Sequence, residues 1–277
     1  MMILRMLMSL TTLSTLMNND KMPVLHTYHL NDKVTAFSTT REGGVSEGLF
    51  ARFNINPYCG DSAEAVQQNK TALCRKLNID SERIILPHQT HGTTHFQVTP
   101  DFFAQTPGKR QQQLEGVDAV STSMTDVCVG VSTADCIPVL LYDEAHHAVS
   151  AIHAGWRGTV QRIVAKTLSK METIYGTNPS DVVAVTGPGI SLAHFEIGDE
   201  VYEQFREAGF DMQTIARRYE KWHIDLPECN RLQLLKAGVK HIHMSGICTW
   251  EQCDTYFSAR RLGAASGRIY TGIILRA

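Results

Sequence analysis

The chain has 277 residues, of which 43% are hydrophobic and 19% are charged, as expected for an ordinary globular protein with one large domain or two small ones. Its formal net charge of -2 gives no electrostatic reason to expect binding to nucleic acid or to an anionic membrane. The seven cysteines are odd in number and irregularly spaced, which disfavours a secreted disulfide framework and favours reduced thiols in a cytoplasmic protein.

Residues 1–22 are rich in leucine and methionine but have no small-residue cleavage site, and they are too short and too polar to span a bilayer. We expect them to form a loosely attached N-terminal extension. No internal repeat or low-complexity linker divides the remaining sequence, so residues 23–277 are predicted to form a single catalytic domain.

Hydrophobic periodicity predicts the main elements in chain order. A capping-box pattern at Asp61 and Glu64 predicts a helix near residues 61–78. Further helices are expected over 159–175, around 201–205 and over 226–235, and strands over 34–38, 127–131, 138–142, 148–152, 182–185 and 268–275. Because strands and helices do not alternate regularly and no Gly-x-Gly-x-x-Gly turn is present, the pattern predicts an α+β fold with mixed sheets rather than a Rossmann domain.

Soft metal ligands lie where these predicted strands meet turns. Cys136 and His153 each lie at one end of an apolar run, and the turn at residues 87–92 offers His88 and His91. Three nitrogen and sulfur ligands from separate segments suit a catalytic zinc, which keeps one coordination position open for water. The spacing does not choose between His88 and His91.

The Asp135–Cys136 pair suggests a functional site. A buried cysteine is often only a small hydrophobic residue, but a carboxylate within an apolar run needs a partner, because burying an unpaired charge is costly. Asp135 and Cys136 are therefore candidate catalytic residues, with Cys136 as a metal ligand or a nucleophile. Cys248 and Cys253 could form half of a zinc knuckle, but no second pair completes it.

The turn after His153 could bind an anion. Gly155 and Gly158 allow close backbone approach, the following helix presents unpaired amides, and Arg157 adds a planar donor group. An ordinary turn with an exposed arginine is the competing interpretation. Glu196 lies between apolar neighbours and would have a raised pKa if buried, which makes it a candidate proton carrier.

These residues and their order resemble the YfiH family, whose members are also called multicopper polyphenol oxidoreductases, laccase-domain proteins or peptidoglycan editing factors. The resemblance covers roughly residues 23–277. The matching blocks are Thr40-Arg-x-Gly-Gly-Val-Ser46, Asn54, Cys59-Gly-Asp61, Gln89-x-His-Gly92, Asp118-Ala119, Thr133-Ala-Asp-Cys-x-Pro-Val-Leu140, His153-Ala-Gly-Trp-Arg-Gly158, Gly187-Pro-x-Ile190, Phe195-Glu-x-Gly198, Cys248-Thr249, Phe257-Ser-x-Arg-Arg261 and Gly267-Arg268.

The resemblance implies a single α+β domain of about four layers that holds zinc through His91, Cys136 and His153. It also implies a purine nucleoside enzyme that phosphorolyses adenosine, inosine or methylthioadenosine to the free base and the ribose 1-phosphate, and that deaminates adenosine. Purine nucleosides and phosphate are thus the expected partners. Older family names imply copper and laccase activity, and a peptidoglycan role has been proposed for the family.

The ligand chemistry helps to separate these activities. A laccase needs several coppers, whereas one thiolate and two imidazoles serve one metal and suit zinc, which has no redox chemistry. Zinc-activated water suits attack on a purine ring, and we expect Arg41, Asn54 and Arg157 to bind the substrate or its phosphate. Two alternatives remain: an amidase-type hydrolase acting on a peptidoglycan precursor, and a non-catalytic metal-binding partner protein. The oligomeric state stays open.

The sequence departs from the family pattern near its C-terminal end. Ala259 and Leu262 stand where many members have tyrosine and aspartate. This block is therefore expected to contribute differently to substrate binding.

Overall fold

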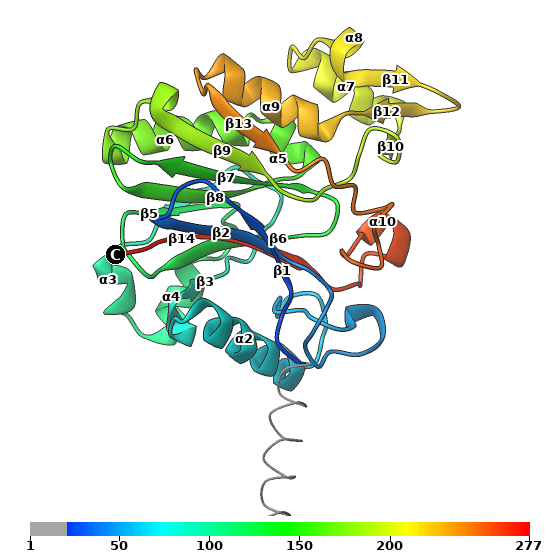
Figure 1. Ribbon diagram of the computed structural model, residues 1–277. Coiled ribbons are helices and arrows are strands. Elements are labelled where there is room, and N and C mark those ends of the chain that lie inside the picture. The colour runs from blue at the N-terminus through cyan, green and yellow to red at the C-terminus, as the bar shows by residue number, and fades with distance from the viewer. Residues whose placement is uncertain (1–20) are drawn as a thin grey trace, which may run out of the picture.

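Two stacked β-sheets form the centre of the computed structural model, which describes residues 21–277 (Figure 1). The expected N-terminal extension, residues 1–22, lies outside the described residues except for Lys21 and Met22. Helices cover the outer face of each sheet, so the order of layers is helix, sheet, sheet, helix (Figure 1).

The first sheet has five strands in the order β1-β2-β14-β6-β3. The last strand of the chain, β14, lies in the middle of this sheet, antiparallel to both β2 and β6, and β3 runs parallel to β6. The strands are β1 (Leu25–Tyr28), β2 (Val34–Thr39), β14 (Ile269–Leu275), β6 (Cys128–Thr133) and β3 (Ile84–Ile85).

The second sheet has six strands in the order β13-β9-β7-β8-β5-β4, and its centre is the antiparallel pair β7 and β8, in which every residue is buried. Its strands are β13 (His241–Met244), β9 (Val182–Thr186), β7 (Ile137–Asp143), β8 (Ala148–Ala154), β5 (Ala119–Thr122) and β4 (His95–Gln97). A small third sheet contains β10 (Glu196–Ile197), β12 (Trp222–Ile224) and β11 (Ala216–Arg218).

The helices divide between the two outer layers and the small sheet. On the six-stranded sheet lie α5 (Trp156–Val160), α6 (Ile163–Tyr175) and α9 (Leu226–Lys236), and beside the five-stranded sheet lie α2 (Ala63–Leu77), α3 (Pro100–Phe103) and α4 (Pro107–Gln113) (Figure 1). The others are α7 (Asp199–Glu207), α8 (Met212–Ile215), α10 (Ala259–Leu262) and the 3-10 helices η1 (Gly48–Phe50), η2 (Ser81–Arg83) and η3 (Pro179–Asp181).

Apolar side chains fill the space between successive layers. Val131, Leu140 and Ile273 are fully buried between the two sheets, and Ile152 and Leu168 belong to the cluster between the six-stranded sheet and its helices. Strands β6, β7 and β8 are therefore buried on both faces, which explains why they appear in the sequence as continuous apolar runs rather than as alternating patterns.

The predicted α+β class with mixed sheets is confirmed, and the predicted strands lie within one or two residues of the observed ones. Two details were wrong. The helix α2 is capped by Ser62, whose side chain accepts a hydrogen bond from the Ala65 amide, and not by Asp61. The helix expected over 159–175 is two helices, because Arg162 has a left-handed backbone conformation (φ 65°) between them.

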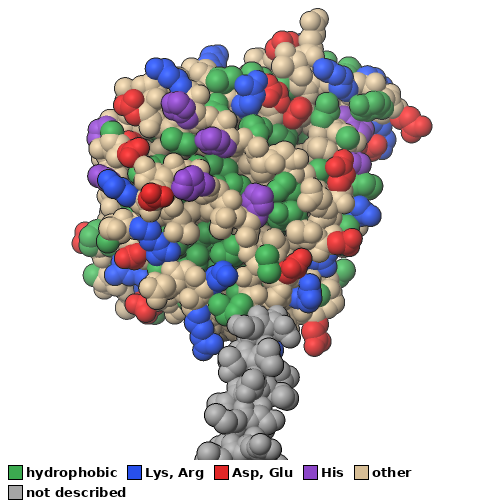
Figure 2. Space-filling model, in the orientation of Figure 1, with side chains coloured by type: hydrophobic (Ala, Val, Ile, Leu, Met, Phe, Trp, Pro, Cys, Tyr) green, Lys and Arg blue, Asp and Glu red, His purple; other side chains and the backbone are tan. Residues whose placement is uncertain are grey.

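Surface and cysteine chemistry agree with the expectations from composition. On the face shown in Figure 2, acidic and basic side chains are interspersed, and no large area carries one sign of charge. All seven cysteines are free thiols. Within residues 21–277, no helix combines the length and the apolar character that crossing a membrane requires.

Candidate metal centre

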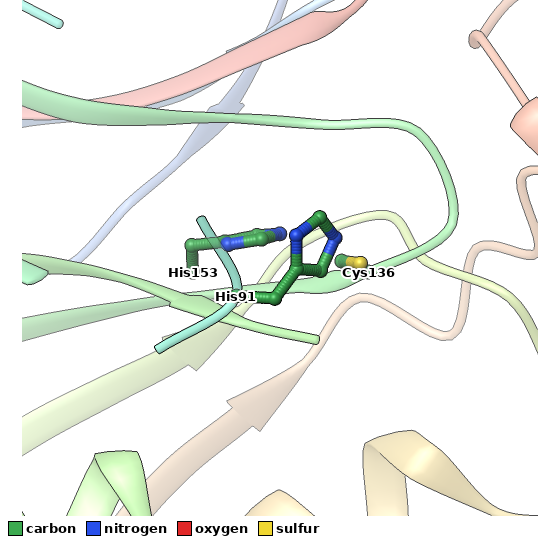
Figure 3. A group of neighbouring side chains, drawn as sticks. All are labelled: His91, Cys136 and His153. Carbon is green, nitrogen blue, oxygen red and sulfur yellow. The ribbon is translucent and has the colours of Figure 1, made fainter. Parts of the chain in front are cut away.

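Three side chains from separate segments meet at one end of the six-stranded sheet (Figure 3). His91 comes from the turn after β3, Cys136 from the turn between β6 and β7, and His153 from the buried strand β8. Their potential ligand atoms all lie within 4.8 Å of one another. The two imidazole rings contact each other edge to face, with centroids 4.7 Å apart. The structure thus brings together the three residues that the family resemblance selects.

The buried carboxylate of Asp118 orients the His153 ring and anchors the backbone of the turn that carries His91. One of its oxygens, Oδ1, lies 2.8 Å from His153 Nδ1 and accepts a hydrogen bond of 3.0 Å from the His91 backbone amide. The other oxygen, Oδ2, accepts a bond of 2.7 Å from the Gly92 amide. Because Nδ1 of His153 is engaged by Asp118, Nε2 faces the cluster, as in the carboxylate–histidine–metal arrangement of zinc enzymes.

Charge in the cluster is distributed as a metal site requires. Burial raises the pKa of the Cys136 thiol, but His153 and His91 together outweigh burial and bring the pKa down to about 6. Burial lowers the pKa of His153, while Cys136 and Asp118 outweigh burial and raise it. The cluster therefore favours a thiolate, which is the form of cysteine that binds metals.

A glycine permits this close approach of side chains. A Cβ atom at Gly155 would lie 2.9 Å from His91 Cδ2 and 3.1 Å from Cys136 Sγ. The backbone of Gly155 (φ -69°, ψ 167°) is accessible to any residue, so what the position requires is the absence of a side chain. Glycine therefore leaves room for the two side chains to converge.

The cluster opens into a cavity of about 310 Å³. This volume lies at the lower end of the range for small-molecule sites. The side chains around the cavity come from both sheets and from the C-terminal segment before β14. They are Asn56, Tyr58, Cys59, His88, Gln89, His91, Ser132, Thr133, Ala134, Cys136, His153, Ala259, Ala264 and Arg268.

An aromatic pair lies on the cavity wall. The ring of Tyr58 stacks on the ring of His88, with centroids 4.2 Å apart and planes inclined by 24°. His88 Nδ1 lies 2.7 Å from a carboxylate oxygen of Glu115. This contact fixes the imidazole ring through Nδ1 and does not involve the other ring nitrogen, Nε2. Although His88 lies outside the metal cluster, it is part of the same cavity.

The cavity also contains one cationic side chain and two buried hydroxyl groups. Arg268 is the single lysine or arginine among the residues that line the cavity. The hydroxyls of Ser132 and Thr133 are buried and have no hydrogen-bond partner within residues 21–277. Buried hydroxyls normally have a partner, so these two groups are suited to contact a ligand.

The two other predicted catalytic residues lie outside this cavity. Asp135 has the partner that its burial required: one carboxylate oxygen accepts from the Thr249 hydroxyl and the other from the Arg260 amide, both at 2.7 Å. The raised pKa expected for Glu196 is wrong. Its side chain is 43% exposed, and a hydrogen bond from Lys221 lowers its pKa. Glu196 borders a separate depression together with Lys221.

The three predicted substrate-binding residues do not line the cavity either. The Arg41 guanidinium donates to the backbone carbonyls of Ala51 and Cys253, and Arg157 is exposed and lies over the ring of Trp156 at 4.3 Å. Asn54 is fully buried, and its side-chain oxygen accepts from the Arg268 amide at 3.1 Å. Asn54 thus positions a residue of the cavity without reaching it.

Sequence reasoning missed Asp118 and Arg268 as members of this site, and it offered His88 only as an alternative metal ligand to His91. Asp118 and Arg268 are present in the matching family blocks, and that is the only signal in the sequence that marks them. Arg268 reaches the cavity because its neighbour Ile269 in β14 pairs with Thr133 in β6. This pairing joins segments that are far apart in the chain, and local patterns do not reveal it.

Comparison with known proteins identifies one family of similar sequences and structures. The family model described as multi-copper polyphenol oxidoreductase laccase matches residues 35–276. A protein of Bacteroides thetaiotaomicron named purine nucleoside phosphorylase is 49% identical, covering 87% of this chain and 92% of its own. A protein of an unknown prokaryotic organism named adenosine deaminase RL5 is 38% identical, covering 87% and 93%. The crystal structure of YlmD from Geobacillus stearothermophilus superposes with a TM-score of 0.82 at 31% identity, covering 89% and 93%.

Proposed function

The chain belongs to the multi-copper polyphenol oxidoreductase laccase family, and from this premise we propose that it is a zinc-dependent purine nucleoside phosphorylase that also deaminates adenosine. The convergence of His91, Cys136 and His153 at the wall of a cavity is the observation that carries the proposal. The names of the relatives, purine nucleoside phosphorylase and adenosine deaminase, support an enzyme of this kind.

The donor set fits zinc. Two imidazoles and a thiolate would supply three of the four ligands that a catalytic zinc takes, and all three residues line the cavity from which a substrate or water could approach. His153 is held by Asp118, and Gly155 leaves space between the ligands. When bound, zinc would supply Lewis acidity toward the substrate and toward water. This cluster offers ligands for one metal ion, and not for the several adjacent coppers that multicopper oxidation needs, so its donor set favours nucleoside chemistry over laccase chemistry.

We assign purine recognition to the stacked pair of Tyr58 and His88. A flat aromatic wall beside the cluster suits a heterocyclic base, because aromatic rings stack at the distances found here. The Glu115 carboxylate orients the His88 ring, so that Nε2 of His88 can exchange a proton with a nitrogen of the base. His88 replaces Glu196 as our candidate proton carrier, because Glu196 is exposed and ion-paired with Lys221.

We assign phosphate binding to Arg268 together with one of the hydroxyls of Ser132 and Thr133, because successive side chains of strand β6 point to opposite faces. The three residues line one cavity, the hydroxyls are buried without a partner in the described chain, and Asn54 fixes the backbone at Arg268. Charge-assisted hydrogen bonds from arginine and neutral ones from hydroxyls are the usual means of binding phosphate. This assignment takes the place of Arg41 and Arg157, which do not line the cavity. The Arg268 guanidinium donates to the carbonyls of Ala264, Ser266 and Gly267, and it would exchange part of these bonds for contacts to a bound phosphate.

The test is product analysis with and without phosphate. With adenosine alone, the zinc-loaded protein should release inosine and ammonia. Added phosphate should also yield free base and ribose 1-phosphate. Cys136→Ser should lose the zinc bound at this cluster and both activities. Products that do not depend on phosphate, combined with cleavage of a peptidoglycan precursor, would instead support the amidase alternative, and turnover of neither substrate would support a binding protein.

A further inference from the structure

A second cluster of metal-binding side chains lies outside the cavity. His194, Cys248 and Glu251 have potential ligand atoms that all lie within 4.8 Å of one another. Cys248 is 5% exposed, whereas the side chains of His194 and Glu251 are 23% and 55% exposed. The cluster thus has a buried sulfur and two ligands at the surface.

We propose that His194, Cys248 and Glu251 form a second binding site for zinc or a similar soft divalent cation. Thiolate, imidazole and carboxylate are the three ligand types that zinc prefers. A tetrahedral zinc with bonds of about 2.0–2.3 Å places its ligand atoms about 3.3–3.6 Å apart. The three ligand atoms lie within 4.8 Å of one another, with 3.0 Å between His194 Nε2 and Glu251 Oε1, and side-chain rotation toward a shared ion would bring them to this range.

The structure already holds two of these ligands in place. The imidazole of His194 stacks on the ring of Trp250, with centroids 3.9 Å apart and planes inclined by 12°. The backbone around Cys248 forms a bridge with Gly189. Side chains with few remaining rotamers lose little entropy when they bind a metal, so this preorganisation favours the site.

The local charges also favour a cation. The Glu251 carboxylate forms an ion pair with His194, and within residues 21–277 no lysine or arginine pairs with it. The Arg261 guanidinium, which contacts the same segment, donates to the Trp250 carbonyl and lies over the Trp250 ring at 4.5 Å. The negative charge of Glu251 is therefore not neutralised by a fixed cation.

An ion at this position would connect two loops that adjoin the first cluster. His194 belongs to the segment before β10, and Cys248 and Glu251 belong to the segment after β13. Thr249, next to Cys248, donates its hydroxyl to Asp135, the neighbour of Cys136. The second site would thus stabilise the turn that presents Cys136, without contacting the cavity.

Metal content of purified full-length protein tests the proposal. After zinc loading and removal of excess ion, the wild type should hold about two zinc ions per chain, and Cys136→Ser and Cys248→Ser about one each. Cys253→Ser is the matched control, because Cys253 is a buried thiol on the same segment but outside the cluster, and this variant should keep both ions. His194→Gln and Glu251→Gln provide the test if Cys248→Ser does not fold.

Cobalt gives an independent signal. In Cys136→Ser, one equivalent of Co²⁺ should produce a thiolate-to-cobalt charge-transfer band from Cys248, and adding His194→Gln to this variant should remove that band. A wild type that binds one ion, with Cys136→Ser binding none, would overturn the second site while leaving the first intact. Conversely, an ion retained in Cys136→Ser and lost in His194→Gln would support the second site whatever the reaction at the first.

Discussion

Replacing Asp118 with asparagine should weaken metal binding without removing any ligand. Asp118 is fully buried, and its two oxygens accept from His153 Nδ1 and from the amides of His91 and Gly92. Asparagine has one acceptor oxygen and one amide group that only donates. If the oxygen faces the backbone amides, the NH₂ group faces His153 Nδ1 and favours the tautomer that carries its proton on Nε2, the atom needed for the metal.

The expected loss follows from the contacts that change. Replacing an outer hydrogen-bond partner of a metal-bound histidine typically costs tenfold to a hundredfold in metal affinity, or about 1.4–2.8 kcal/mol. The buried donors that lose an acceptor add about 1–3 kcal/mol of lost folding stability. Asp118→Asn should therefore fold, with a lower urea midpoint, and bind zinc ten to a hundred times more weakly.

Competition with a chromophoric chelator measures the zinc affinity directly. The matched control is Asp143→Asn, because Asp143 is also fully buried in the six-stranded sheet and accepts from the backbone and Nδ1 of His146, at the opposite end of strand β7 from Cys136. This control should lose stability and keep its zinc affinity. Equal zinc affinity in Asp118→Asn and the wild type, with circular dichroism unchanged, would refute the role of Asp118.

Three further predictions concern other parts of the molecule. Gly155→Ala should lower zinc occupancy, because the new Cβ would approach two cluster side chains to 2.9 and 3.1 Å. Gly108→Ala, with no atom near its added Cβ, is the control and should leave occupancy unchanged. Equal zinc content in both variants would contradict this reasoning. Arg268→Ala should raise the KM for phosphate roughly tenfold to a hundredfold through loss of a charge-assisted contact. Arg157→Ala should leave the KM for phosphate unchanged. If Arg157 binds the phosphate instead, steady-state kinetics with varied phosphate would show a raised KM in Arg157→Ala and an unchanged KM in Arg268→Ala. Burial, together with Lys170, lowers the pKa of His95 to about 4. Since the unfolded histidine takes up a proton near its ordinary pKa of 6.5 and the folded one does not, stability should fall as the pH drops from about 6.5 toward 4, by at most about 3 kcal/mol. Urea midpoints measured over this range should change less with pH in His95→Gln.

The sequence predicted the parts of the fold that depend on local patterns. Strands β6, β7 and β8 are buried on both faces, so their continuous apolar runs were sufficient to identify them. The break between α5 and α6 was missed, because Arg162 carries no glycine or proline signal. Its left-handed conformation accompanies tertiary contacts, in which its guanidinium lies over Phe210 and donates to the Ala208 carbonyl.

For similar reasons, some residues of the candidate site could be predicted from the sequence and others could not. Cys136 and His153 lie where apolar strands end and are visible in the sequence, whereas the choice of His91 over His88 depended on the family resemblance. Glu196 was misjudged because its neighbours Phe195 and Ile197 are apolar. In a strand, successive side chains point to opposite faces, so buried neighbours leave the residue between them exposed. The position of Arg268 beside the cavity depends on the register of β14 against β6, which local sequence patterns do not reveal.

The central position of β14 bears on how the protein folds during synthesis. Strands β2 and β6 are separated by β14, which is the last strand to be made. Until residues through Leu275 have emerged from the ribosome, the facing edges of β2 and β6 remain unpaired, and exposed strand edges can pair with other chains. The five-stranded sheet is therefore complete only once β14 has been made, and chaperones that shield strand edges would protect β2 and β6 until then.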